Sequence, residues 1–228
     1  MITLMEAIEQ RHSVRSYTDE PIAPEAAERL QQLIEEVNDE GNVSIQLVLD
    51  EPDAFTGFKA RYGKFSNVRN YLALVGPDCK ELDEALGYAG EKLVLQAQQL
   101  GLNSCWVGST YRVVRGRYSI QPHEKLAAVI ALGHGVTAGT ARKSVAPETV
   151  APGYGEAPDW FQRGVQAALL APTALNQQKF RFTWEGAQID GVPLVRDTTK
   201  RGPFARMDLG IAKLHFEIGA GDAKFAWD

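Results

Sequence analysis

Apolar residues recur at intervals of three and four in several stretches of the chain, which is the period of an amphipathic helix. In residues 24–37 the apolar positions are Ala27, Leu30, Ile34 and Val37, with Pro24 early enough to stand in a first helical turn. A longer stretch, residues 81–100, has the same period and ends at Gly101, a residue typical of a helix end. The predicted helices cover residues 4–11, 24–37, 81–100, 159–170 and 208–220.

Alternating apolar positions mark two of the predicted strands, and short apolar runs mark others. Ile45, Leu47 and Leu49 stand at alternate positions, a strand pattern with one buried face, and Phe180, Phe182 and Trp184 do the same far downstream. The predicted strands cover residues 44–50, 71–75, 103–108, 127–133 and 180–184. Residues 136–158 are rich in Ala, Thr, Gly and Pro and lack periodicity, which is typical of a connector. We therefore expect a longer half (residues 1–145), a connector (146–158) and a shorter half (159–228) within one compact domain.

The two halves resemble each other weakly. A shift of 135 residues places Gln31 on Gln166 and the strand at 44–50 on the strand at 180–184. A different shift places Gly87 and Ala89 of the long helix on Gly210 and Ala212 of the last helix. The pattern indicates a degenerate internal duplication. Chance similarity remains the alternative, because helix–loop–strand units are common.

Composition narrows the classes of function. The chain has 228 residues, 44% of them hydrophobic, with a formal net charge of −5, so we expect a globular protein that does not bind nucleic acid broadly. Cys79 and Cys105 are the only cysteines, and no His or Cys pair has metal-ligand spacing, which disfavours a disulfide scaffold or a zinc site. With no signal peptide or long apolar stretch, we expect a cytoplasmic protein without a membrane span.

Two distant segments carry the candidate binding chemistry. Arg11, His12, Ser13 and Arg15 follow the first predicted helix. If that segment is extended, its alternate residues share one face, and two guanidiniums and a hydroxyl converge as they would on a phosphate. The second segment, residues 171–178, is an amide-rich loop after a helix, suited to the edge of a planar heterocycle. A solvated basic turn and an ordinary helix-ending turn are the plain alternatives.

Two further segments add weaker signals. Val107 and Gly108 end a predicted strand, where free backbone N–H groups can face a ligand. Arg142 and Lys143 follow a glycine-rich strand end and offer either a further phosphate contact or a surface charge pair. Cys105 lies in an apolar run without a nearby base and is not read as a nucleophile.

Taken together, these segments resemble the FMN-dependent nitroreductases. Residues 10–15 (QRHSVR) resemble the phosphate-binding signature of that family, and residues 171–178 (APTALNQQ) resemble its Ala-Pro-Ser-x-x-Asn-x-Gln-Pro-Trp loop. Residues 98–108 resemble its long helix and following strand, and Arg142-Lys143 its basic pair. The resemblance implies an α+β, nitroreductase-like fold with a mainly antiparallel central sheet flanked by helices.

The order of the motifs departs from the usual pattern. The Ala-Pro-Ser loop normally comes soon after the arginine segment, and two subunits share each flavin, whereas here the recognisable loop comes only after residue 170. The chain resembles a divergent, Thermotoga-type branch in which one chain mimics the two-subunit arrangement. This implies that a monomer can act as a pseudo-dimer, while a homodimer is not excluded.

Carried over residue by residue, the resemblance implies that FMN is the cofactor and that the flavin, rather than any side chain, carries the chemistry. Arg11, Ser13 and Arg142 would bind the phosphate, Arg15 would lie near the ribityl chain or ring, and backbone N–H groups of Val107, Gly108 and Ser109 would face flavin N5. The remaining implied cofactor-binding residues are His12, Lys64, Lys143, Pro172, Thr173, Ala174 and Asn176.

The implied activity is that of an FMN-dependent NAD(P)H oxidoreductase. Hydride passes from NAD(P)H through flavin N5 to a small-molecule electron acceptor such as a nitroaromatic or a quinone. Two alternatives stay open. The Pro-Trp ending of the loop is replaced by Lys179-Phe180 after Gln178, which favours a flavin-binding protein for storage, sensing or electron relay without efficient turnover. The other alternative is a decayed, flavin-free interaction domain.

Overall fold

The computed structural model describes residues 1–228, apart from the side chain of Glu185. A four-stranded antiparallel sheet forms the centre of the longer half, in the order β1-β2-β4-β3. Its strands are β1 (Gln46–Val48), β2 (Asn70–Pro77), β3 (Asn103–Val107) and β4 (Glu124–Gly133). The middle strand β2 is buried over most of its length, because helices and loops cover both faces of the sheet.

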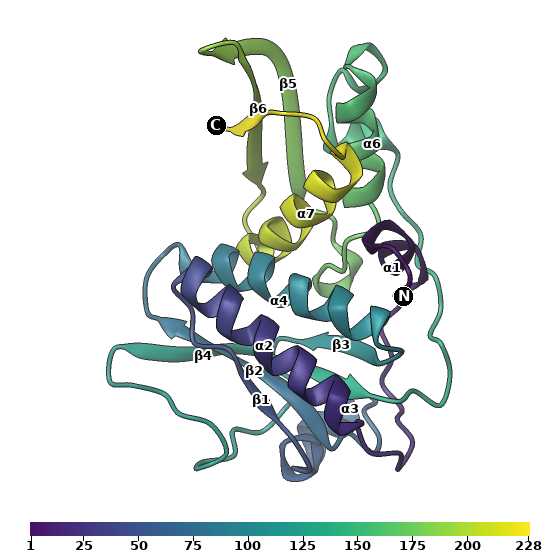
Figure 1. The fold of residues 1–228 in the computed structure, drawn as a ribbon, viewed down its shortest axis with the longest axis vertical. Helices are drawn as coiled ribbons and strands as arrows, with labels where there is room; N and C mark the ends of the chain where they lie inside the picture. The colour runs from purple at the N-terminus through teal and green to yellow at the C-terminus, as the bar shows by residue number, and fades with distance from the viewer.

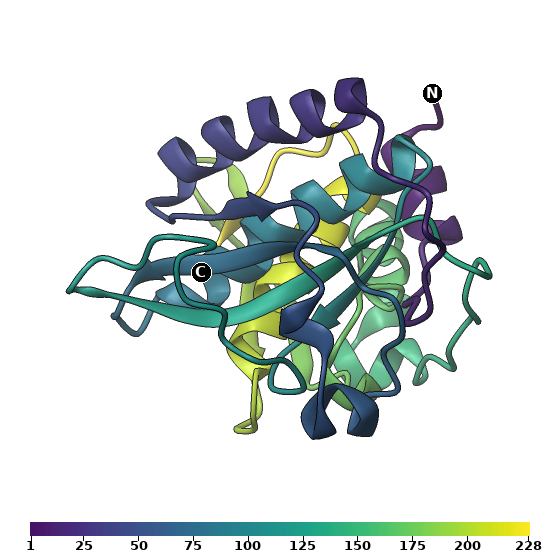
Figure 2. The ribbon, with the colours of Figure 1, turned by 90° about the horizontal axis from the view of Figure 1, so that it is seen from below.

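Two helices cover one face of this sheet. They are α2 (Pro24–Gly41) and α4 (Leu82–Gln99), and they lie side by side above the strands (Figures 1 and 2). Leu72 and Ile130 of the sheet pack with Leu86 and Leu93 of α4 in one buried cluster. The other face packs against a short 3-10 turn (Asp53–Phe55), α3 (Phe58–Tyr62) and the loops around them. The predicted α+β fold with an antiparallel central sheet is confirmed.

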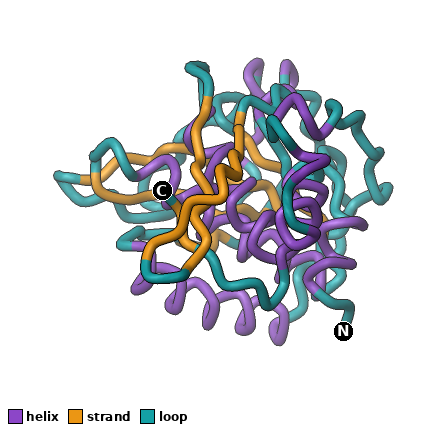
Figure 3. The backbone as a smooth tube through the Cα atoms, turned by 90° about the horizontal axis from the view of Figure 1, so that it is seen from above, coloured by secondary structure: helices purple, strands orange, loops and turns teal.

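The shorter half is built from a second sheet and two helices. Strands β5 (Phe180–Ile189) and β6 (Val192–Thr199) form an antiparallel hairpin, and β7 (Ala226–Trp227) pairs with β6 in parallel. Helices α6 (Asp159–Ala168) and α7 (Ala205–Ala220) pack beside it. Seen from above, the strands of the small sheet lie in front of the helices, with the C-terminus beside them (Figure 3). Phe161, Phe180, Phe182 and Phe216 fill this core.

The two halves meet where α4 crosses α7 (Figure 1). The crossing is tight because each helix has a glycine there: a Cβ on Gly87 would overlap the Met207 carbonyl, and one on Gly210 would overlap the Glu84 carbonyl. Helix α1 (Leu4–Gln10) covers both helices from one side, with Ala7 and Ile8 packed on Leu95 and Leu214. Within the described residues, no helix has the length and apolar character needed to cross a membrane.

Several elements differ from the sequence predictions. The prediction missed α3, β6 and β7, and residues 136–158 contain a short helix, α5 (Pro147–Val150), and a 3-10 turn (Tyr154–Glu156). The strand expected over residues 44–50 pairs only as Gln46–Val48, because the backbone of Ile45 instead bonds with the side chain of Asn38 in the last turn of α2. The last helix begins at Ala205, three residues earlier than expected.

Candidate functional site

The arginine segment leaves α1 and runs along β3. Arg11 caps the helix in an extended conformation, and its backbone N–H still donates to the Ala7 carbonyl. Ser13 then forms a parallel bridge with Ser104 of β3, and the Val14 N–H donates to the Ser104 carbonyl at 3.0 Å. The extended geometry assumed from the sequence is therefore present. It buries Arg11, which is 2% exposed, leaves Ser13 half-buried and leaves Arg15 exposed, with its guanidinium 5.9 Å from the centre of the Phe65 ring.

The Arg11 guanidinium enters a buried polar network. Its Nε lies 3.8 Å from a carboxylate oxygen of Glu91, too far for a hydrogen bond, and is left without a hydrogen-bond partner among the described residues. Glu91 is fully buried and accepts from Trp106 Nε1 at 2.8 Å, and it lies 2.9 Å from His215 Nε2. Burial lowers the pKa of Arg11, and the Glu91 carboxylate opposes that shift. The guanidinium thus has a counter-charge but keeps an unused donor.

Arg142 lies on an irregular strap, residues 142–145, that crosses the end of α6. The Arg142 guanidinium donates to the Leu170 carbonyl, and the Ser144 hydroxyl donates to the Leu169 carbonyl at 3.0 Å. These are carbonyls that a helix end leaves without partners. Arg142 Nε is buried and has no hydrogen-bond partner among the described residues. Burial, and next the charge of Arg11, lower the pKa of Arg142 to about 10.

Arg11, His12 and Arg142 therefore share one electrostatic site. Burial lowers the pKa of His12, and the charges of Arg11 and Arg142 lower it further. Two guanidiniums, buried on Arg11 and half-buried on Arg142, each have a buried Nε without a hydrogen-bond partner in the described part of the chain. They form a site in which an anion would supply negative charge and the missing acceptors.

Helix α7 holds the amide-rich loop, residues 171–178, through the side chain of Asp208. The buried Asp208 carboxylate accepts from the Ala174 N–H at 3.0 Å and from Gln177 Nε2 at 2.7 Å. Burial raises the pKa of Asp208 to about 6. Leu175 and Asn176 have φ values of 52° and 54°, a left-handed conformation that is costly for a non-glycine residue. The loop keeps this conformation because its polar groups are held on several sides.

The strap and the loop are also tied to each other. Asn176 Nδ2 donates to the Lys143 carbonyl at 2.8 Å, and the Val145 N–H donates to Gln178 Oε1 at 3.0 Å. Asn176 Oδ1 is buried without a hydrogen-bond partner among the described residues. The strap and the loop thus act as one wall that presents an unused donor, Arg142 Nε, and an unused acceptor.

A cavity of about 100 Å³ lies between this wall and the end of β3. It brings together residues from both predicted segments and from α7. The lining residues are Ser13, Arg15, Trp106, Val107, Gly108, Ala128, Pro172, Thr173, Ala174, Leu175, Phe204, Met207, Asp208 and Ile211. Ring-binding pockets typically have about 300–1,000 Å³, so this cavity is small as the side chains stand.

Phe204 is the reason for the small volume. Its ring covers Gly108, and a Cβ at position 108 would lie 2.5 Å from one ring carbon. Phe204 precedes α7 with a φ of 58°, a second non-glycine residue in the left-handed region that lines the cavity. A neighbouring cavity of about 500 Å³, lined by Gly108, Ser109, Lys59 and Tyr111 among others, begins on the other side of Gly108.

The structure thus brings most of the predicted site residues together, some as the lining of one cavity and others through electrostatic interaction or through the strap. Ser13, Arg15, Val107, Gly108, Pro172, Thr173 and Ala174 line one cavity, and Arg11, His12 and Arg142 interact electrostatically. Asn176 joins them through the strap, whereas Ser109 lines the neighbouring cavity. Lys64 and Lys143 are exposed, and in the described part neither lines either of these two cavities.

Sequence reasoning missed Glu91, Asp208 and Phe204. A usable signal existed for the first two, because each is an acidic residue in a mostly apolar or small helical stretch. Asp208 lies in Met207–Ala212, and Glu91 lies in Leu86–Ala97, where Lys92 and Gln96 are the other polar residues besides Tyr88. A buried carboxylate in such a helix requires partners. No sequence pattern marks Phe204, whose position depends on the tertiary contact with Gly108.

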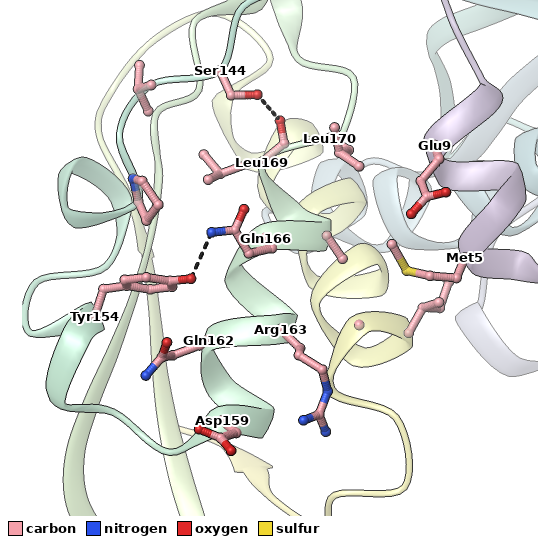
Figure 4. Close-up of a pocket in the computed structure, with 15 residues that line it drawn as sticks. Met5, Glu9, Ser144, Tyr154, Asp159, Gln162, Arg163, Gln166, Leu169 and Leu170 are labelled. Atoms are coloured by element: carbon pink, nitrogen blue, oxygen red, sulfur yellow. Dashed lines mark hydrogen bonds between the residues drawn. The ribbon is translucent and has the colours of Figure 1, made fainter.

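A larger groove of about 890 Å³ lies behind the strap, between α1, the connector, α6 and α7 (Figure 4). Its wall includes Ser144 and Leu169, which are joined by a hydrogen bond, and Tyr154 and Gln166, which are joined by another at 2.7 Å. The buried cations of the site are absent from its lining. It is therefore a separate groove that shares only the strap and the end of α6 with the candidate site.

Comparison with known proteins gives one family. Residues 3–220 match the family described as "Putative TM nitroreductase". No curated protein sequence matches the chain.

Similar solved structures include a putative nitroreductase from Thermotoga maritima, with 20% identity over 94% of this chain and 82% of that chain and a TM-score of 0.68. Another is a putative nitroreductase from Desulfovibrio desulfuricans in complex with FMN, with 22% identity over 65% of this chain and 95% of that chain and a TM-score of 0.50. Nitroreductase A from Vibrio parahaemolyticus has 18% identity over 66% of this chain and 74% of that chain, with a TM-score of 0.54.

Proposed function

Because this chain belongs to the nitroreductase family described as "Putative TM nitroreductase", we propose that it is an FMN-dependent oxidoreductase. Bound FMN would supply the redox chemistry, taking hydride from NAD(P)H and passing electrons to a nitroaromatic, a quinone or a related acceptor. The chain's own residues bind and orient the cofactor and tune its environment. They need supply neither a nucleophile nor a metal ligand, and the described residues contain no cluster of three or more His, Cys, Asp or Glu suited to a metal ion.

One observation carries the proposal: Arg11 Nε and Arg142 Nε are buried donors without a hydrogen-bond partner among the described residues, and the charge of Arg11 lowers the pKa of Arg142. A phosphate between them would accept from both and neutralise the repulsion. His12 and Ser13 lie beside them on the same extended segment, where they can add polar contacts. The residues present therefore fit a phosphate-bearing cofactor.

The ring would lie between the end of β3 and the loop from the shorter half. Val107 and Gly108 offer backbone on one side, and Pro172, Thr173 and Ala174 close the other. Arg15 lines the same cavity and would place a cation next to the ring, which stabilises negative charge on it. Asp208 acts indirectly, because it fixes the loop through the Ala174 N–H.

We further propose that one chain builds the whole site. The cavity is lined by Ser13 and Gly108 from the longer half and by Thr173 and Asp208 from the shorter half. Native mass spectrometry of the loaded protein should give one FMN per chain at every assembly state, including the monomer. Two flavins that appear only in a dimer and are lost with it would contradict this arrangement.

The activity itself is tested by spectroscopy and turnover. Purified protein mixed with FMN should give a flavin absorption band that is bleached by NADH or NADPH, and a nitroaromatic should restore the band under turnover. The small cavity beneath Phe204 favours a second candidate, a flavin-binding protein without efficient turnover. A retained flavin band that neither nicotinamide bleaches would favour that candidate, and failure to bind FMN at all would refute both.

A further inference from the structure

A sequence shift between the two halves places residues that line the candidate flavin cavity on residues that line a second cleft. Gly87 and Gly210 differ by 123 residues, and their contacts are reciprocal: each glycine faces the carbonyl three residues before the other one. The same shift relates the α7 residues that line the flavin cavity to three α4 residues that line the second cleft. The equivalent pairs are Met207 with Glu84, Asp208 with Ala85, and Ile211 with Tyr88.

The ends of α6 and α2 are related in the same way. The loop after α6 lines the flavin cavity with Pro172 and Leu175. A shift of 135 residues carries these positions to Val37 and Glu40 at the end of α2, and both line the second cleft. Helix α4 and the end of α2 therefore line the second cleft with positions equivalent to those by which α7 and the loop after α6 line the candidate flavin cavity. Its lining residues come mainly from α2, α4 and α7, and Figure 1 shows α4 between the other two helices.

The second cleft differs from its counterpart in size and in chemistry. Its volume is about 640 Å³, within the range of small-molecule sites. One wall is formed by Tyr88, Glu217 and Trp227. The Tyr88 hydroxyl donates to one oxygen of the Glu217 carboxylate, and Trp227 Nε1 donates to the other at 2.7 Å. Two neutral donors thus hold a carboxylate in a fixed orientation between two aromatic rings.

This carboxylate is the unbalanced charge of the cleft. Lys92 pairs with Glu40 at 2.7 Å, while Arg206 and Lys213 both pair with Glu84 at 3.0 Å. Glu217 has no ion-pair partner among the described residues, although both of its oxygens retain room for a further donor. A phosphate is disfavoured here, because each cation of the lining already has a carboxylate.

Each ring of this wall already lies against a lysine ammonium, so the rings offer a ligand apolar surface, and recognition of its charge falls to Glu217. Lys213 Nζ lies 4.8 Å from the centre of the Trp227 ring, and Lys92 Nζ lies 5.3 Å from that of Tyr88. Both distances fall within the range of cation–π contacts. Burial, and next the hydrogen bond to the Glu217 carboxylate, raise the pKa of Tyr88, so its hydroxyl remains a donor at neutral pH.

From the equivalent position, the oriented carboxylate and the aromatic walls, we propose that the second cleft binds an organic cation. The ligand class is an ammonium that carries an apolar or aromatic group. The ammonium pairs with Glu217, and the apolar group packs against Tyr88, Trp227 and the small residues of the floor, Ala85 and Ala89. The two clefts would thus have opposite charge preferences, and binding of the cation does not depend on flavin binding.

The test uses phenyltrimethylammonium as the probe and tert-butylbenzene as its neutral analogue of the same shape. Calorimetry on the full chain should give saturable binding of the cation, and the neutral analogue should bind about tenfold more weakly or less. Glu217→Gln keeps an acceptor for Trp227, while its amide N–H can donate to the Tyr88 hydroxyl oxygen. The substitution removes the charge and should weaken binding of the cation by about tenfold. Glu81→Gln is the matched control, because it removes a charge from the exposed rim of the same cleft and should change binding less than about twofold.

Glu217→Gln should keep the thermal stability and the FMN affinity of the parent protein, so that a loss of cation binding is not a loss of folding. If it unfolds, the parent protein with the two probes still decides the question. Equal binding of the charged and neutral probes, unchanged cation affinity in Glu217→Gln, or no saturable binding at millimolar probe would each overturn the proposal. None of these results bears on the flavin site.

Discussion

Gly210→Ala tests the crossing of α4 and α7 that joins the two halves. A Cβ at position 210 would lie 2.9 Å from both the Glu84 carbonyl carbon and the Tyr88 nitrogen, against 3.4 Å or more for ordinary contacts. These atoms are backbone, so no side-chain rotation relieves the overlap, and the helices must separate. Overpacking of this kind costs about 3 kcal/mol at the upper end of the usual range, while alanine improves helix propensity by about 1 kcal/mol. We expect a net loss of about 2 kcal/mol.

The assay is urea unfolding followed by circular dichroism. Gly87→Ala should lose a similar amount, about 2 kcal/mol, because its Cβ would meet the Met207 backbone in the same way. The double variant should lose less than the sum, because helices separated for one Cβ already make room for the other. Gly155→Ala is the control: no atom of the described residues lies within 4 Å of its Cβ position, and its stability should change by less than about 0.5 kcal/mol. A Gly210→Ala protein as stable as the parent would refute the close crossing.

Three further predictions concern the site. Asp208 has a pKa of about 6 in the folded protein, above that of the unfolded chain, so the folded state binds its proton more tightly and this group adds stability as the pH falls from 7 to 4. The gain over this interval is about 2 kcal/mol; urea midpoints at the two pH values should show it in the parent and not in Asp208→Asn, and parallel shifts would contradict it. Glu91→Gln leaves Arg11 buried without its counter-charge and should lower the free energy of unfolding by about 3–5 kcal/mol; a melt that matches the parent would exclude a structural role for this ion pair. Phe204→Ala uncovers Gly108 and should raise the rate of FMN association in stopped-flow fluorescence; an unchanged rate would show that Phe204 does not gate the cavity.

The helices and most strands were predictable because their periodicity coincides with burial. In α2, Leu30, Ile34 and Val37 are the buried face that the pattern predicts. Strands β6 and β7 were missed for a physical reason. In β6, exposed and half-buried residues such as Arg196 and Asp197 surround the single buried Val195, so its sequence lacks a clear apolar face. Pairing with β5, rather than local pattern, makes it a strand.

The candidate site was predictable only in part. The extended segment from Arg11 to Arg15 and the loop at 172–175 meet as expected, because each has its own local signal. The burial of Arg11 against Glu91 could not be read from either segment, since the partner lies 80 residues away in the middle of a helix. The exposure of the Lys143 side chain also depends on tertiary contacts and could not be predicted from the local sequence. The strap binds Asn176 through the Lys143 carbonyl, rather than through its ammonium.

The most direct test of the central claim compares FMN with riboflavin, which has the same ring but no phosphate. If Arg11 and Arg142 hold the phosphate, fluorescence titration should show FMN binding at least about 100-fold more tightly than riboflavin, since two charge-assisted hydrogen bonds are each worth about 1.5–3 kcal/mol. Arg142→Gln should remove most of that preference while leaving riboflavin affinity unchanged, and Arg29→Gln, which removes an equal charge from the exposed surface of α2, should preserve it. Equal affinities for FMN and riboflavin in the parent protein would contradict the account.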